Sequence, residues 1–340
     1  MHRQTISRRR VGQTTALGIG LALLAPWALA QSGTVKSPVE RYLAQERFSL
    51  VAPFPPGGPI DSLARIMADG LQKKYGQGAV VENLPGAAGN IGIDKVKRAK
   101  GDGRTLLVVP AGNLTINPTL MPNFPFDIER DFVPITMLAK APNVLVAHPS
   151  TGFKTARDLI AAARAKPDTL SFASPGVGSG LHLAGELFKH QSQLEILHVP
   201  YKGSGQALND VLGGTVPLMF SNLPVMLSSI RSGKLVALGI TDVNRSAVAP
   251  EIPTLAEQGV ANVVVTSWYG LLAPAGTPPE VVEQLASDAR EFLDQPAVRE
   301  SLNAQGLTES TMTPAAFGAY IRNETATWAG VIKARKIVAH

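Results

Sequence analysis

Residues 48–65 read FSLVAPFPPGGPIDSLAR, and they predict a strand, a glycine-containing turn and a helix in direct succession. The opening run FSLVAPF is rich in residues that favour strands and ends at a turn made of proline and glycine. The helix that follows has apolar residues at i, i+3, i+4, i+7 and i+11, which places them on one face. These residues are Ile60, Leu63, Ala64, Met67 and Leu71.

The same alternation of strand and helix continues along the chain and predicts an α/β fold. Two stretches, residues 138–146 and 263–276, are the places where the chain is expected to pass between two lobes. Two crossings predict a discontinuous first lobe, 47–142 with 267–340, and a second lobe, 143–266. Lobes joined in this way close on each other by hinge motion about the crossings.

The first thirty residues have the three parts of a secretory signal peptide. A basic stretch with four arginines is followed by an apolar run and by Ala28-Leu29-Ala30. We therefore predict cleavage near Ala30 and a periplasmic location for the mature protein. Residues 7–11, SRRRV, also fit a twin-arginine signal, so both export routes stay open.

Charge and cysteine content exclude several classes of protein. The chain has 32 Lys and Arg against 26 Asp and Glu, and four of the arginines lie in the predicted signal peptide. The mature chain then has 28 basic and 26 acidic residues, a net charge of +2, which removes the main support for nucleic-acid binding. Since there are no cysteines, disulfides, thiol catalysis and cysteine-ligated metals are excluded.

Three glycine-containing loops each follow a predicted strand and enter a predicted helix: residues 53–61, 83–92 and 174–182. The first N–H groups of a helix lack intrahelical partners and favour anions, so such loops can hold a carboxylate without Lys or Arg. We expect the first and third loops to grip an anion across the cleft between the lobes, with Gly58 and Gly178 requiring positive φ or close approach. The alternative is that these glycines only form tight turns.

Four polar side chains in these loops have two interpretations each. Asp61 can hold a ligand amine or cap its helix. Ser174 and Ser179 can donate hydroxyls to a carboxylate or cap the helix that begins near residue 180. His182 lies one turn into that helix, where it can face the cleft or pack as an ordinary histidine.

Aromatic and amide side chains near the same loops complete the candidate site. Phe54, Tyr201 and Trp268 stand within two residues of glycine or proline at strand ends, so we expect them to form pocket walls rather than core. Asn90 and Asn113 follow glycines, and each is either a ligand donor or a turn former.

No catalytic or cofactor motif is present. The chain lacks a G-x-S-x-G nucleophile elbow, H-E-x-x-H, a P-loop and a complete G-x-G-x-x-G fingerprint. We therefore predict ligand binding without catalysis, with no catalytic residue, metal or cofactor. An exported α/β hydrolase and a protein-interaction module remain the alternatives.

An ordered set of motifs resembles the substrate-binding proteins of tripartite tricarboxylate transporters, the Bug family of extracytoplasmic solute receptors. The set spans residues 48–335 and includes VAPFPPGGPIDSLAR, VVENLPGAAGNIG, FASPGVGSGLHLAGELF, HVPYKGSGQALNDVLGG, PTLAEQG and SWYGLLAPAGTP. The sequence departs from the family at Pro217, where members carry an acidic residue.

The resemblance implies a two-lobed periplasmic binding protein fold (Venus flytrap, type II-like) acting as a monomer. It further implies a small carboxylate ligand, whether a mono-, di- or tricarboxylate, an acidic amino acid or an aromatic acid, and delivery of that ligand to membrane transporter subunits. Loops equivalent to the first and third would hold the ligand carboxylate, partly through ordered waters. Carried onto this chain, the ligand-binding residues would be Phe54, Pro56, Gly57, Gly58, Asp61, Ser174, Gly178, Ser179 and His182.

Overall fold

The computed structural model describes residues 37–201 and 203–338. The predicted signal peptide and its cleavage site at Ala30 lie outside the described residues. All described elements belong to one compact unit, residues 36–340.

One sheet contains the strands from both ends of the described chain, in the order β11-β4-β10-β3-β1-β2. β1 pairs in parallel with β2 and β3, whereas β10 pairs antiparallel with β3 and β4. The strands are β1 (Phe48–Ala52), β2 (Ala79–Asn83), β3 (Thr105–Pro110), β4 (Phe132–Ala141), β10 (Ser267–Pro274) and β11 (Thr308–Glu309). The helices that accompany them are α1 (Pro38–Leu43), α2 (Pro59–Tyr75), the 3₁₀ turn η1 (Ala87–Gly89), α3 (Asn90–Lys97), α4 (Ala111–Thr115), α5 (Asn117–Leu120), α6 (Ile128–Asp131), α11 (Pro279–Leu293), α12 (Pro296–Ala304) and α13 (Pro314–Arg335).

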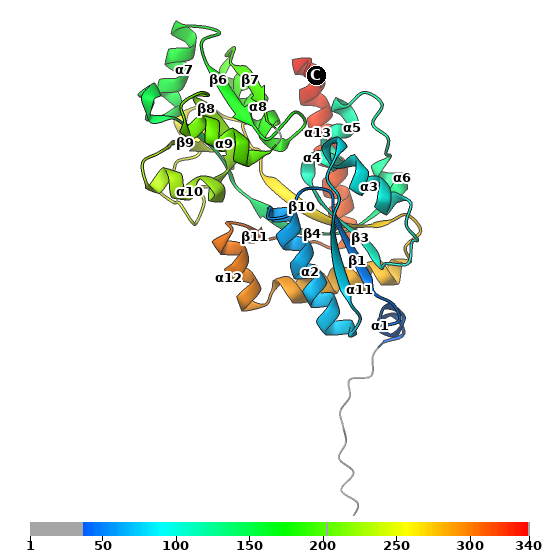
Figure 1. The fold of residues 1–340 in the computed structure, drawn as a ribbon. Coiled ribbons are helices and arrows are strands. Elements are labelled where there is room, and N and C mark those ends of the chain that lie inside the picture. Colours follow the sequence, from blue (N-terminus) through cyan, green and yellow to red (C-terminus); the bar gives the residue numbers. More distant parts are fainter. Residues whose placement is uncertain (1–36, 202, 339–340) are drawn as a thin grey trace, which may run out of the picture. The chain divides into compact units, whose positions relative to one another are not determined.

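A second sheet, drawn in green to yellow in Figure 1, contains the middle of the chain in the order β7-β6-β8-β5-β9. Its strands are β5 (Asn143–Ala147), β6 (Ser171–Ser174), β7 (Leu197–Pro200), β8 (Leu218–Asn222) and β9 (Val236–Ile240). Its helices are η2 (Pro149–Thr151), α7 (Ala156–Ala165), α8 (Gly180–Ser192), α9 (Ser204–Leu212), α10 (Leu223–Arg231) and η3 (Ala256–Gln258). Each sheet contains both parallel and antiparallel strand pairs and is accompanied by helices. Two such units agree with the predicted two-lobed α/β class.

The chain moves between the sheets at two places. β4 ends at Ala141 and β5 begins at Asn143, and the chain returns to the first sheet at Ser267. Because the contacts join residues 36–340 into one unit, the exact boundaries of the two lobes stay a prediction.

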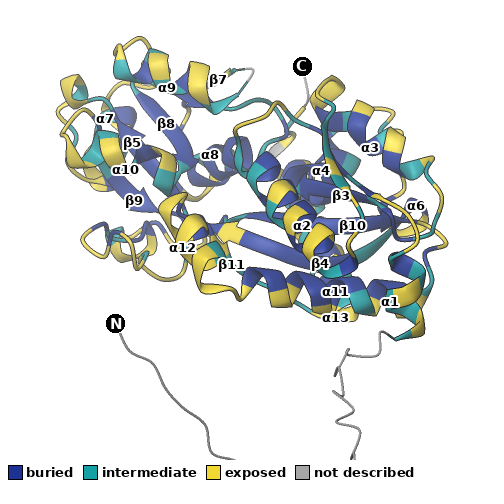
Figure 2. Cartoon of the chain, turned by 60° about the horizontal axis from the view of Figure 1, so that its bottom comes forward, coloured by how far each residue is buried: buried dark blue, intermediate teal, exposed yellow. Residues whose placement is uncertain are grey.

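Helix α2 buries the apolar face that its sequence predicts. Leu63, Ala64, Met67 and Leu71 have no exposed surface, and Ile60 is buried as well. These side chains belong to one apolar cluster with strands of the first sheet and with α11. Figure 2 shows the same division, with β3 and β10 mostly in dark blue and yellow residues spaced along α2. This packing fixes the position of the loop that precedes α2.

Helix α13 packs against both groups of elements. Its Phe317 and Ile321 lie in an apolar cluster of the first sheet. Farther along the helix, Trp328 and Ile332 join a different cluster, made mostly of second-lobe residues together with Ile116 and Leu120. The C-terminal helix therefore connects the two lobes without being one of the two crossings.

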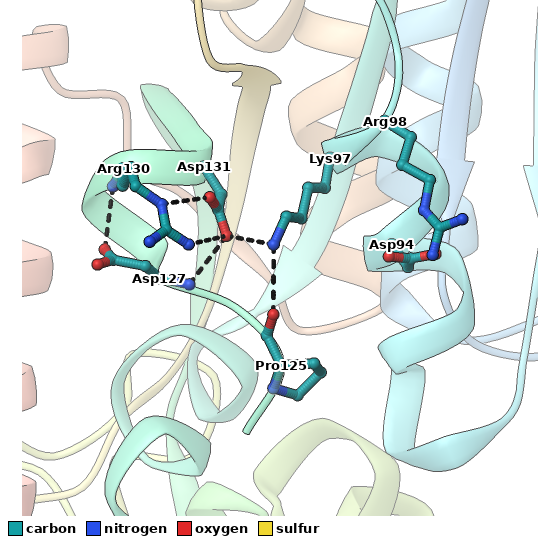
Figure 3. A network of polar contacts seen from close by, with 7 residues as sticks. All are labelled: Asp94, Lys97, Arg98, Pro125, Asp127, Arg130 and Asp131. Carbon is teal, nitrogen blue, oxygen red and sulfur yellow. Dashed lines mark hydrogen bonds and ion pairs between the residues drawn. The ribbon is translucent and has the colours of Figure 1, made fainter. Parts of the chain in front are cut away.

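A buried carboxylate fastens α6 to α3 (Figure 3). Asp131 forms ion pairs with Lys97 (2.8 Å) and Arg130 (2.9 Å) and accepts a hydrogen bond from the Asp127 N–H (2.9 Å). Hydrogen bonding from Arg130, and then from Lys97, holds the pKa of Asp131 well below its ordinary value, although burial acts in the opposite direction. Asp131 is only 7% exposed, in contrast to the surface pair Asp94–Arg98.

We expect Asp131→Asn to lower the free energy of unfolding by about 1.5–3 kcal/mol at pH 7, the range for hydrogen bonds to charged groups. Because the folded pKa is depressed, this contribution is complete at neutral pH and is lost as the pH falls below about 4, the unfolded value. Urea unfolding at a series of pH values measures it, and the gap between wild type and variant should narrow in acid. Asp94→Asn is the control, since exposed pairs contribute about 0–1 kcal/mol. An equal loss in both variants would contradict the assignment.

Candidate ligand-binding site

The loops after β1 and β2 and the start of α4 meet at one edge of the first sheet, because parallel strands end at the same edge. A Cβ atom added to Gly89 would lie 3.3 Å from the Phe54 ring and 3.1 Å from Asn113 Nδ2. Asn113 Nδ2 donates to the Ala88 carbonyl (2.7 Å), and Asn83 Nδ2 donates to the Phe54 carbonyl (3.2 Å). The first two glycine loops and α4 thus form one continuous surface.

The side chain of Asp61, in the first turn of α2, holds the first loop in place. Its carboxylate accepts hydrogen bonds from the Gly57 N–H (3.1 Å) and from Arg65 (two of 3.0 Å). Burial would raise the pKa of Asp61, but these hydrogen bonds outweigh it and lower the pKa. Asp61 therefore secures the turn before the helix, although no side-chain capping hydrogen bond forms at Gly58, the N-cap of α2. Pro56 lies exposed at the tip of the loop.

In the third loop, both candidate serines bond to the loop itself. Ser174 Oγ accepts from the Gly176 N–H (3.2 Å) and lies 2.7 Å from His198 Nε2. Ser179 is the N-cap of α8: its Oγ accepts from the His182 N–H (3.1 Å) and donates to the Gly176 carbonyl (2.8 Å). The serine hydroxyls therefore shape the loop.

His182 packs beneath this loop as part of a stack of three rings. Its imidazole lies 4.0 Å from that of His198, which stacks on Phe172 at 4.9 Å, centroid to centroid. Burial, with a smaller effect from the neighbouring ring, lowers the pKa of His182 to about 3, and burial lowers that of His198 to about 4. Both are neutral at pH 7, and His182 Nδ1 accepts from the Gly178 N–H (3.4 Å). His198 did not stand out in the sequence because it lies on a different strand, β7.

The third loop contacts α4 and α5 of the first lobe at very short range. A Cβ added to Gly112 would lie 2.7 Å from the Gly178 carbonyl oxygen, and one added to Gly178 would lie 2.5 Å from Asn117 Oδ1. Gly178 also has φ +79°, so the expected need for glycine is correct there. At Gly58 the expectation of strain is wrong, because its φ is −96° and a Cβ would meet open space.

Two of the aromatic candidates lie in different surroundings from each other. Tyr201 is half-buried, and its hydroxyl donates to Asp210 (2.7 Å); burial and this carboxylate raise its pKa to about 12. Trp268 is only 1% exposed, its indole N–H donates to Glu324 (2.8 Å), and it packs edge-on against Phe317. Trp268 is therefore a core residue and not the expected pocket wall, because β10 is covered by α13 at this position.

Two buried amide oxygens near the loops have no hydrogen-bond partner among the described residues. One belongs to Asn90, which opens α3, and the other to Asn117, which opens α5. Asn90 was a sequence candidate, whereas Asn117 was not, since nothing in a short Asn-Pro helix start marks it as buried.

In the part of the chain that the structure describes, no three His, Asp or Glu side chains are grouped to hold a metal ion, and no helix has the length and apolarity needed to cross a membrane. Two hollows border α6 and α13, around Ile128 and Arg322, and no residue of the three loops lines either of them. The loops remain the better candidate because their glycines and helix starts suit an anion.

Comparison with known proteins gives consistent matches over most of the chain. The family model described as tripartite tricarboxylate transporter family receptor matches residues 63–337. Protein BugT of Bordetella pertussis is 40% identical over 285 residues, covering 84% of this chain and 87% of BugT.

Two solved structures from Rhodopseudomonas palustris are also similar. Rpa4515 with adipate superposes with a TM-score of 0.80 at 33% identity, over 87% of this chain and 99% of that one. MatC (Rpa3494) with bound malate gives a TM-score of 0.76 at 29% identity, over 85% and 99% of the two chains. These matches confirm the predicted two-lobed binding-protein fold. The chain therefore belongs to the tripartite tricarboxylate transporter receptor family, a family of solute-binding receptors.

Proposed function

We propose that this protein captures a small carboxylate between its lobes in the periplasm and delivers it, as a monomer and without chemical change, to a tripartite tricarboxylate-type membrane transporter. Membership of the receptor family supports the delivery role. The neighbours that hold adipate and malate support a carboxylate as the ligand.

The observation that carries the proposal is the open start of helix α2. A Cβ on Gly57 or Gly58 would meet nothing within 4 Å, so the backbone here faces free space. The first intrahelical bond is donated by Ser62 to the Gly58 carbonyl, which leaves the N–H groups of Ile60 and Asp61 without intrahelical partners. Such N–H groups, together with the helix dipole, attract a carboxylate.

The third loop supplies a second helix start. Gly180 begins α8 and likewise has open space where a Cβ would be. Ser179 already satisfies the His182 N–H, so the N–H groups of Gly180 and Leu181 are the ones that an anion would use. Neither the first nor the third loop contains Lys or Arg, and Arg65, on the first turns of α2, is paired with Asp61. Backbone donors would therefore provide the anion site.

The Ser174–His198 pair resembles the serine–histidine contact of a hydrolase, but its surroundings argue against catalysis. Ser174 has no exposed surface, so a substrate carbonyl could not reach its Oγ. His198 has a ring stacked on each face, and its pKa of about 4 makes it a weak base at neutral pH. These contacts support a structural role for the pair.

We expect Gly58→Ala to separate binding from folding. At an ordinary φ, replacing glycine by alanine stabilises a protein by about 0.4–1 kcal/mol, so the melting temperature should stay or rise. The added methyl group would keep an anion away from the start of α2, and affinity should fall at least about tenfold, or 1.4 kcal/mol. Calorimetric titration with a panel of carboxylates measures the loss.

Gly78→Ala is the matched control. Gly78 also has open space at its Cβ position, but it precedes β2 at the opposite end of that strand from the glycine loop. Affinity should be unchanged in this variant. If Gly58→Ala bound carboxylates as tightly as wild type, the start of α2 would not be the anion site.

A further inference from the structure

Glu324 on α13 is a largely buried carboxylate that the proposed function does not use. Its Oε2 accepts a hydrogen bond from the Trp268 indole N–H (2.8 Å), and its Oε1 accepts one from the Tyr320 hydroxyl (3.3 Å). The Thr115 hydroxyl of α4 is a third hydrogen-bond partner. These three partners are uncharged, so hydrogen bonds rather than an ion pair compensate the burial of this carboxylate.

The pKa of Glu324 reflects the same balance. Burial raises it above its ordinary value, while the hydrogen bonds from Trp268, Thr115 and Tyr320 act in the opposite direction. A buried acidic group held only by uncharged donors is costly, and its two oxygens allow it to serve several donors at once. The cost therefore directs attention to what these donors connect.

The partners outside α13 belong to two other elements. Trp268 lies on β10, next to Ser267, whose hydroxyl donates to Asn143 at the first crossing (2.9 Å). Thr115 is the last residue of α4, which packs against α13. One carboxylate of the C-terminal helix therefore fastens α4 to the strand that follows the second crossing.

Helix α4 is the member of this group that reaches the candidate site. A Cβ added to Gly112 would lie 2.7 Å from the Gly178 carbonyl oxygen of the third loop. Asn113 Nδ2 donates to the Ala88 carbonyl of the second loop (2.7 Å). The helix has only five residues, and so short a helix is not stable by itself. Its position therefore depends on contacts such as that made by Thr115.

We infer that Glu324 is a positioning residue for the proposed carboxylate-binding function, on which this inference rests. The carboxylate holds α4 in place, and α4 in turn keeps the second and third loops at the spacing that a ligand requires. Glu324 acts through α4 and not by contact with the ligand. Its removal should therefore weaken binding while every residue of the three loops stays unchanged.

The experiment compares two substitutions of Glu324 by calorimetric titration with adipate, malate and glutamate. Glu324→Leu removes both acceptors, and for the acids that wild type binds its affinity should be at least about tenfold lower, or 1.4 kcal/mol. Glu324→Gln keeps an oxygen for the indole N–H, and its amide N–H groups can donate to the hydroxyls of Thr115 and Tyr320. Its affinity should stay within about threefold of wild type. Without ligand, the amides of α4 should exchange with deuterium faster in Glu324→Leu and at nearly the wild-type rate in Glu324→Gln.

Asp288→Leu is the matched control, because it removes another buried carboxylate beside the first sheet. Asp288 accepts hydrogen bonds from Tyr75 (2.5 Å) and Gln284 (2.8 Å) and pairs with Lys74 (2.9 Å), so its partners lie on α2 and α11 and not on α4. Both leucine variants should melt at a lower temperature than wild type. Asp288→Leu should nevertheless keep the wild-type affinity within about twofold and the wild-type exchange rate of α4. Equal losses of affinity in the two variants would show that affinity follows overall stability and would overturn the positioning role.

A milder variant keeps the test decisive if Glu324→Leu does not fold. Trp268→Phe retains an aromatic ring and removes the indole N–H, and its affinity should fall at least about threefold. Unchanged affinity or unchanged exchange of α4 in the tested variant would overturn the role of Glu324, as would a glutamine variant as weak as the leucine variant. Wild type that binds none of the three acids would overturn the proposed function instead, and exchange of α4 in the free protein would still show whether Glu324 positions that helix.

Discussion

Asn143→Ala is expected to lower the free energy of unfolding by about 3 kcal/mol and to weaken ligand binding. Asn143 has no exposed surface and lies where the chain first crosses between the lobes. Its Nδ2 donates to the Val265 carbonyl of the second crossing (2.8 Å), and its Oδ1 accepts from Asn222 (2.8 Å) and Ser267 (2.9 Å). One side chain therefore joins both crossings to the end of β8.

The expected size follows from the loss of three hydrogen bonds, one buried and two partly buried, each contributing about 1 kcal/mol net. The affinity for the ligand should also fall. Without the Asn143 bonds the two crossings are less constrained, so a ligand that bridges the lobes must also order them. Urea denaturation followed by circular dichroism gives the stability, and calorimetric titration gives the affinity. Asn303→Ala, at an exposed helical position, should change stability by less than about 0.5 kcal/mol. Wild-type stability in Asn143→Ala would show that the crossings are held by other contacts.

Trp328→Ala should lower the free energy of unfolding by about 3–5 kcal/mol, the range for removing a buried large aromatic side chain. Trp328 is only 6% exposed and lies in the apolar cluster that also contains Ile332, Leu120 and second-lobe residues such as Leu183. Helix α13 contacts α4, α5 and α8, so the cavity would open between elements of both lobes.

Because the damaged contact joins the lobes, the variant should also differ from wild type in shape. Small-angle scattering of the ligand-free protein should give a larger radius of gyration for Trp328→Ala. Val338→Ala, an exposed apolar position just beyond the helix, is the control and should leave both quantities unchanged. A loss of stability below about 1 kcal/mol in Trp328→Ala would show that α13 packs on the second lobe without holding it.

Local patterns in the sequence predicted several features correctly. The apolar periodicity of α2 and the glycine loops at strand ends depend on residues close together in the chain, so they can be identified from spacing alone. The expectations that failed concern backbone angles and packing. Nothing local to Gly58 shows that its φ is ordinary, and nothing near Trp268 shows that α13 covers it.

By itself, the sequence determined the α/β class, the resemblance to the receptor family, the absence of cysteine chemistry and of familiar catalytic motifs, and the three loops suited to an anion. Only the tertiary structure decided that the third loop meets α4 and α5, that His182 stacks on His198, and that Asn117 keeps an unpaired oxygen at that contact. The physical reason is that these contacts join residues far apart in the chain. Their geometry depends on how two sheets and a shared C-terminal helix pack together, which no spacing within a single segment records.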